Sequence, residues 1–183
     1  MLRTAKSLFI TPLALFVAAA ALFRAPETIA PNDNRQAAGT LANGVLTVNL
    51  EARTGVWHPE GDMGAALDVA AFAETGKPMS TPGPLIRVVV GTEVRGSVHN
   101  TLDKPLVIHG LGATRGMSDS MVVPVNGSSE FRFTATTPGT YYYLAKRAVD
   151  PFGLRALGDQ QLNGAITVDP AAVPHVATDR VFV

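Results

Sequence analysis

Apolar and polar residues alternate along much of the chain after residue 44. Between Val45 and Ala52 every second residue from Leu46 onward is apolar, and the residues between them are polar. A period of two places the two sets on opposite faces of a β-strand, so this stretch predicts a half-buried strand. Further short runs, some alternating and others mainly apolar, predict strands at 86–90, 94–99, 106–109, 131–135, 141–144 and 165–168. Gly and Pro interrupt the chain between the runs, as is typical of turns.

Many short strands separated by turns favour an all-β fold, and we predict a Greek-key β-sandwich. The stretch Gly64–Glu74 fits both a helix and a strand, and we interpret it as a strand. The alternation also predicts which side chains form the core. The residues expected inside are Leu46, Val48, Leu50, Ile86, Val88, Val94, Val98, Ile108, Phe131, Phe133, Tyr141, Tyr143 and Ile166.

The composition excludes several classes of function. The 183 residues include 15 basic and 15 acidic side chains, which argues against a nucleic-acid partner, because such proteins usually carry a basic excess. The chain has no cysteine, so disulfide bonds and thiolate metal sites are impossible. The hydrophobic fraction of 46% is sufficient for a packed core.

The first 24 residues have the layout of an export signal. Arg3 and Lys6 precede a largely apolar run from Leu8 to Phe23, as in a secretory signal peptide. An uncleaved N-terminal membrane anchor is the alternative, although the run is short for a membrane span. Both interpretations predict an exported protein that is periplasmic or extracellular, either free or tethered to the membrane.

The rest of the chain divides into three parts. Residues 25–42 are polar, small and Pro-containing, and we interpret them as a linker. The predicted domain covers residues 43–170. In residues 171–183, the final stretch Asp179–Val183 has the pattern of a new strand. We interpret this part as the start of an interdomain connection or of a truncated second domain.

Several segments, in order, resemble a known family. They are Pro82–Arg87, Ile108–Gly112, Phe131–Phe133, Pro138–Tyr143 and Asn163–Val168. Together they are similar to the N-terminal cupredoxin (plastocyanin-like, type 3) domain of bacterial-type multicopper oxidases. The resemblance implies a cupredoxin-like β-sandwich, copper as the family's cofactor, and oxidoreduction as its activity. It also implies further cupredoxin domains, C-terminal to this one, as partners.

In that family, two His-x-His pairs in this domain aim imidazoles at a shared copper cluster, and this chain departs from the pattern. The first pair keeps His109 but has Leu111, and the second pair is replaced by Leu144 and Lys146. Leu has no donor atom, and protonated Lys has no free lone pair. The resemblance therefore implies His109 as the single retained metal-ligand position, and it implies no catalytic residue. We expect that this chain alone does not bind copper tightly, and that the four positions lie together at the edge of the domain.

Two interpretations of function remain open. The chain is either the leading domain of a multicopper-oxidase-type protein, active only with later domains, or a non-catalytic structural or binding module of the cell envelope. His109 likewise has an alternative interpretation, as a histidine at a strand end that is hydrogen-bonded to the backbone. The remaining histidines, His58, His99 and His175, are scattered and form no ligand pair.

Overall fold

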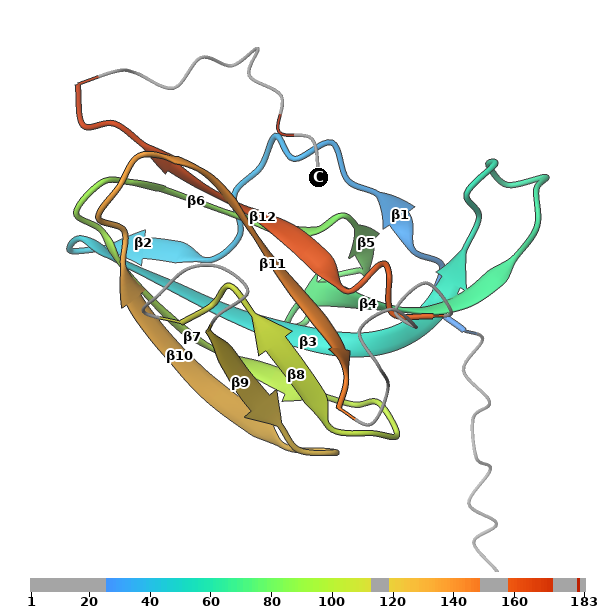
Figure 1. The fold of residues 1–183 in the computed structure, drawn as a ribbon. Coiled ribbons are helices and arrows are strands. Elements are labelled where there is room, and N and C mark those ends of the chain that lie inside the picture. Colours follow the sequence, from blue (N-terminus) through green and yellow to red (C-terminus); the bar gives the residue numbers. More distant parts are fainter. Residues whose placement is uncertain (1–25, 113–118, 149–157, 173–180, 182–183) are drawn as a thin grey trace, which may run out of the picture.

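The computed structural model describes residues 26–112, 119–148, 158–172 and 181. Two five-stranded sheets face each other, and a third sheet has two strands (Figure 1). Within the described residues, all the regular secondary structure consists of β-strands. The strands are β1 (Ala30–Pro31), β2 (Thr40–Ala42), β3 (Val45–Trp57), β4 (Leu67–Glu74), β5 (Ser80–Thr81), β6 (Gly83–Val89), β7 (Glu93–Asn100), β8 (Leu106–His109), β9 (Ser120–Val123), β10 (Ser128–Thr134), β11 (Gly139–Arg147) and β12 (Asn163–Asp169). Over the same ranges, no helix is long and apolar enough to cross a membrane.

The first sheet has the order β10-β7-β3-β2, and β4 pairs with the second half of β3. The second sheet has the order β6-β12-β11-β8-β9. From β7 onward the chain crosses to the second sheet for β8 and β9, returns to the first for β10, and crosses again for β11. Crossovers between sheets are typical of Greek-key sandwiches. The predicted all-β sandwich is therefore confirmed.

The core lies between the two sheets and contains the residues that the alternation predicts. All the expected residues are buried except Tyr141, which is half-buried and packs against the core. Each fully buried aliphatic or aromatic side chain contributes about 1.5–3 kcal/mol through the area it removes from water. The inner faces of the strands thus hold the sandwich together.

Tyr143 of β11 is the largest fully buried side chain of this core. Its hydroxyl donates a hydrogen bond of 2.7 Å to the carbonyl oxygen of Pro84, and its ring lies 5.4 Å from the ring of Phe72. A Cβ at Gly164 would overlap the Tyr143 ring, so glycine is needed there for the close approach. Burial raises the pKa of the Tyr143 phenol far above its ordinary value.

The ambiguous stretch 64–74 contains a strand, as predicted, because β4 spans Leu67–Glu74. Two of its side chains, Ala70 and Phe72, belong to the main core. The alternate residues Val69, Ala71 and Ala73 pack in a second, smaller cluster with Ile29 and Met79. Since β4 is buried on both faces, its apolar run lacks the alternation that would have distinguished it from a helix.

Most of the stretch that was interpreted as a linker is packed against the sandwich. Residues 26–39, here called the N-terminal segment, pack along β3, β5 and β6, and Ile29 is 2% exposed. The amide of Ile29 donates to the carbonyl of Val56 at 2.8 Å, and Ala38 donates to Leu85 at 2.8 Å. Most of these attachments use backbone groups, which do not depend on an apolar side-chain pattern. A polar composition therefore concealed a packed segment.

A glycine on β3 makes this packing possible. A Cβ at Gly55 would lie 2.7 Å from the carbonyl oxygen of Glu27 and 2.9 Å from the side chain of Ile29. The carboxylate of Glu27 also accepts a hydrogen bond of 2.7 Å from the amide of Met79 and lies 3.2 Å from the guanidinium of Arg53. The N-terminal segment is therefore held directly against the sheet. Of the strand pattern expected at Asp179–Val183, only Val181 lies within the described residues.

Candidate functional site

Strands β8 and β11 lie side by side and carry three of the four positions that the family resemblance matches to copper ligands. On β11, Tyr143 and Ala145 face the core, so Leu144 and Lys146 alternate onto the opposite side. His109 ends β8 and lies directly opposite Leu144 in the antiparallel register. We call this side of the second sheet its outer face. Directly opposed residues have Cβ atoms about 4.5–5.5 Å apart, so His109 and Leu144 are immediate neighbours.

His109 has a defined hydrogen bond. Its Nδ1 lies 3.1 Å from the backbone carbonyl oxygen of Asp119. Because a carbonyl oxygen only accepts, Nδ1 carries the proton, and in the neutral ring Nε2 holds the lone pair. A metal-binding histidine is commonly oriented in this way. The bond also matches the alternative interpretation of a strand-end histidine tied to the backbone.

The side chains next to His109 have no ligand chemistry. Leu144 is 7% exposed and belongs to neither apolar cluster of the described residues, in keeping with its place on the outer face. The ammonium of Lys146 lies 3.4 Å and 3.5 Å from the carbonyl oxygens of Arg147 and Ala148. A cation in this position opposes the binding of a metal ion.

The fourth position, Leu111, does not lie with the other three. The expectation that all four positions lie together at the edge of the domain is therefore wrong for Leu111. Gly110 follows β8 with a φ of 89°, a left-handed conformation that favours glycine. A Cβ there would also overlap the carbonyl oxygen of Tyr142. Beyond this turn, Leu111 is 1% exposed and belongs to the main core cluster. Its side chain therefore packs in the core, apart from the outer face.

The loop before β12 fixes the end of β11, a role that the sequence did not reveal. Asp159 is 3% exposed, and its carboxylate accepts hydrogen bonds from the backbone amide of Arg147, at 2.8 Å, and from the Arg147 guanidinium. The side chain of Gln161 accepts a hydrogen bond of 2.5 Å from Thr81. The sequence did not reveal this role, because contacts between side chains of separate segments have no local sequence pattern.

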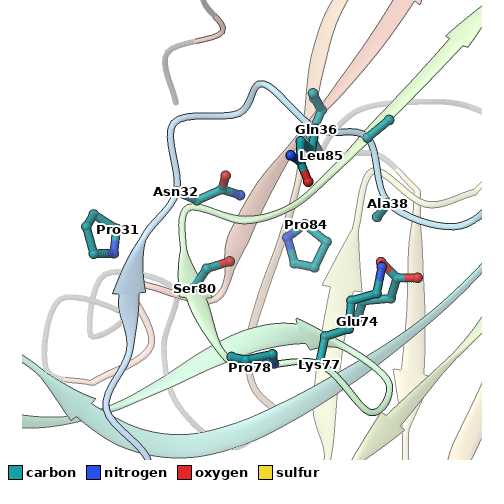
Figure 2. A pocket seen from close by; sticks show the side chains of 11 residues that line it. Pro31, Asn32, Gln36, Ala38, Glu74, Lys77, Pro78, Ser80, Pro84 and Leu85 are labelled. Carbon is teal, nitrogen blue, oxygen red and sulfur yellow. The ribbon is translucent and has the colours of Figure 1, made fainter.

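A cleft elsewhere in the domain is not part of this arrangement. It has a volume of about 190 Å³ and lies between the N-terminal segment and strands β4 to β6 (Figure 2). Several of the polar side chains in its wall bond to the protein itself: Asn32 donates to the carbonyls of Pro82 and Gly83, and Lys77 pairs with Glu74. The described residues contain no group of three or more His, Cys, Asp or Glu side chains that could hold a metal ion.

Comparison with known proteins assigns the chain to a family. Residues 76–172, more than half of the chain, match the family model described as multicopper oxidase. The chain belongs to the multicopper oxidase family. The matched region runs from before β5 to beyond β12 and contains all four positions discussed above. Copper is thus the cofactor expected from family membership.

One curated multicopper oxidase shows how much longer such proteins are. Multicopper oxidase MmcO of Mycobacterium tuberculosis is 34% identical over 99 residues, which are 51% of this chain and 18% of that protein. The chain thus spans less than a fifth of the length of this multicopper oxidase.

Solved structures share the fold. A multicopper oxidase of Campylobacter jejuni, a metallo-oxidase, aligns with a TM-score of 0.52 and 18% identity over 81% of this chain and 31% of that chain. The copper nitrite reductase of Nitrosomonas europaea aligns with a TM-score of 0.55 and 21% identity over 72% of this chain and 45% of that chain. Lac15 from a marine microbial metagenome aligns with a TM-score of 0.55 and 23% identity over 71% of this chain and 34% of that chain. The predicted cupredoxin-like sandwich is confirmed.

The side chains of this multicopper oxidase domain do not fit a copper ion at the family's ligand positions. The outer face offers one imidazole, from His109, beside a leucine and an ammonium group. Copper sites in proteins use several nitrogen or sulfur donors, and neither Leu144 nor Lys146 supplies one. The family's cofactor and the donor set of this domain therefore disagree.

Proposed function

We propose that this chain is one domain of a longer multicopper-oxidase-type protein, and that it holds no copper through its own residues. On its own it has no oxidase activity and acts as a structural module. Its outer face, with His109, Leu144 and the half-exposed Tyr142, docks a following cupredoxin domain of the same protein. The length of the curated multicopper oxidase, of which this chain covers 18%, supports the existence of such a partner.

The register of β8 and β11 carries this proposal. It places Leu144 directly opposite His109, with Lys146 two residues further along the same face. The strands that would present the ligands are intact, but the donor atoms are missing. An oxidase must take electrons from its substrate and pass them to oxygen, and one imidazole without a cysteine provides no site for either step.

The cellular location of the protein is also part of the proposal, and it rests on the sequence alone. The basic start and the apolar run from Leu8 to Phe23 support export to the periplasm or the extracellular space. The N-terminus then either tethers the domain to the membrane or is removed.

Copper retention tests the proposal. The purified chain is loaded with copper(II), dialysed and analysed for metal, and a chromogenic phenol assay is run alongside. The wild type should retain far less than one copper per chain and should show no turnover above that of free copper. One firmly held copper per chain, or clear turnover, would contradict the proposal.

A pair of variants provides the positive control. Leu144→His with Lys146→His should gain copper retention, because the two new imidazoles and His109 would then give three imidazoles on the outer face. Adding His109→Ala to this double variant should remove most of the gain. If the double variant retains no more copper than the wild type, the outer face does not have the ligand geometry described above.

A further inference from the structure

Strand β10 forms an edge of the first sheet (Figure 1). It pairs with β7 along its whole length, Ser128–Thr134, without a shift of register, and no described segment pairs with its other side. Other sheet edges are shorter or covered: β2 has three residues, β9 has four, and the N-terminal segment bonds to β6. Proteins commonly protect an edge with proline, a β-bulge or charged side chains, and β10 has only the charges. The direction of its backbone and the order of its charges therefore decide what this edge can pair with.

Hydrogen bonds at the two ends of β10 show which of its backbone groups the sheet uses. The amide of Ala135 donates to the carbonyl of Thr92 at 2.9 Å. At the other end, the carbonyl of Gly127 accepts from the amide of Asn100 at 2.9 Å. Because only every second residue of an antiparallel strand bonds to a given neighbour, the odd-numbered residues bond to β7. The N–H and C=O groups of the even-numbered residues point away from the sheet. These residues are Ser128, Glu130, Arg132 and Thr134.

The exposed side chains of β10 carry one acid and one base, two positions apart. Glu130 and Arg132 are both exposed, and they flank Phe131, which is buried in the core. In an antiparallel pair of two β10 strands centred on Phe131, Glu130 of each copy lies directly opposite Arg132 of the other. A shift of two residues would instead oppose two glutamates or two arginines, which is unfavourable. The charges therefore favour one register, and in that register the opposed residues are those whose backbone groups point away from the sheet.

Arg132 also has room for a further acid. Its guanidinium pairs with Glu93 at 2.6 Å, while its side chain remains 72% exposed. A guanidinium has five N–H donors, so one carboxylate does not use them all. Arg132 lies directly opposite Arg95 of β7, and like charges in such a pair repel. A second carboxylate from outside the chain would reduce this repulsion.

We propose that two copies of this chain pair through their β10 strands, antiparallel about a two-fold axis at Phe131, and so join their first sheets into one continuous sheet. The backbone groups of the even-numbered residues form the new ladder, and the two Glu130–Arg132 pairs set its register. The proposed docking of a following domain uses the outer face of the second sheet, whereas this contact uses the edge of the first. The two proposals therefore stand or fall separately.

Charge reversal tests this contact. In analytical ultracentrifugation the purified chain should show a concentration-dependent dimer. Glu130→Arg and Arg132→Glu each place like charges opposite one another, and each should weaken dimerisation by more than about tenfold. An equimolar mixture of the two variants should restore the dimer, because the basic edge of one variant then faces the acidic edge of the other.

Glu60→Arg is the matched control, because it makes the same change of charge as Glu130→Arg at an exposed residue between β3 and β4. It should leave dimerisation unchanged. A monomeric wild type would overturn the inference. So would reversal variants that dimerise as strongly as the wild type, or a mixture of the two that stays monomeric.

A disulfide between the two copies tests the register. The chain has no cysteine, so every cross-link must come from an introduced one. In the proposed register Ser128 of one copy lies opposite Thr134 of the other, with Cα atoms about 5.5 Å apart, a separation that a disulfide can span. Under mild oxidation, a mixture of Ser128→Cys and Thr134→Cys should form a cross-linked dimer faster than either variant alone. A mixture that cross-links no faster than the separate variants would contradict the proposed pairing.

Discussion

The two faces of β11 differ in how far they keep the roles that the family resemblance implies. On the inner face, Tyr143 and Ala145 are fully buried, and Tyr143 reaches across the core to Phe72 and Pro84. On the outer face, Leu144 and Lys146 stand where the family resemblance expects imidazoles. The same strand therefore keeps its packing role and lacks its ligand role. The inner face of β11 thus contributes to the packed core, whereas positions 144 and 146 on its outer face supply no free donor atom.

The largest loss of stability is expected when a histidine is introduced at position 111, inside the core. Leu111→His should lower the free energy of unfolding by about 3–5 kcal/mol, because it removes core packing and buries an imidazole without an assigned partner. Urea unfolding measures the change. The comparison variant Leu144→His should cost clearly less, since position 144 lies on the outer face beside His109. Equal losses in the two variants would contradict the different placement of the two leucines.

A smaller effect is expected from the hydroxyl of Tyr143. Tyr143→Phe should cost about 1 kcal/mol at neutral pH, because the bond to the carbonyl of Pro84 is lost. The exposed neighbour provides the control: Tyr142→Phe, with Tyr142 at 51% exposure, should stay within about 0.5 kcal/mol of the wild type. A similar loss in both variants would contradict the role given to the buried hydroxyl.

The same tyrosine predicts the response to alkali. Burial raises the pKa of Tyr143 in the folded state, so above pH 10 the unfolded chain loses this proton while the folded chain keeps it. The folded state then binds more protons, and stability should fall by about 1.4 kcal/mol for each pH unit above 10. Urea unfolding between pH 9 and about 11 should show that Tyr143→Phe loses this part of the slope. An unchanged slope would refute the assignment.

The smallest effect is expected at Lys146. Lys146→Met keeps most of the side chain's length and removes its charge on the outer face. The free energy of unfolding should change by no more than about 0.5 kcal/mol, because the side chain lies partly in solvent and its contacts with the carbonyl oxygens of Arg147 and Ala148 are long. A loss as large as that of Tyr143→Phe would show that the outer face contributes to stability as much as the inner one.

The features that could be predicted from the sequence are those with a local period. The alternation in β3 predicted the inward set Leu46, Val48 and Leu50, and all three are buried. Tyr141 is half-buried although it shares the face of Tyr143, because it lies near the start of β11, where the hydroxyl reaches back to the carbonyl of Thr137. The alternation along a strand predicts which face of the sheet a side chain lies on, but it does not predict how deeply that side chain is buried.

The features that could not be predicted depend on distant partners. Gly110 turns the chain after β8 and sends Leu111 into the core, although a simple i, i+2 spacing placed it beside His109. The bond of Asp159 to Arg147 and the packing of Ile29 over Gly55 join segments that carry no common pattern. His109 itself was found by resemblance, and whether it binds a metal stays a prediction.

The attachment of the N-terminal segment also has a consequence for the order of folding. Glu27 bonds to the amide of Met79, which is 52 positions away, so this contact closes a long loop. Closing long loops is slow compared with forming neighbouring hairpins. During synthesis, residues 26–39 emerge before β5 and β6, so the segment can reach its place only after those strands have followed. Residues 26–39 are therefore synthesised early but are among the last parts of the domain to form their native contacts.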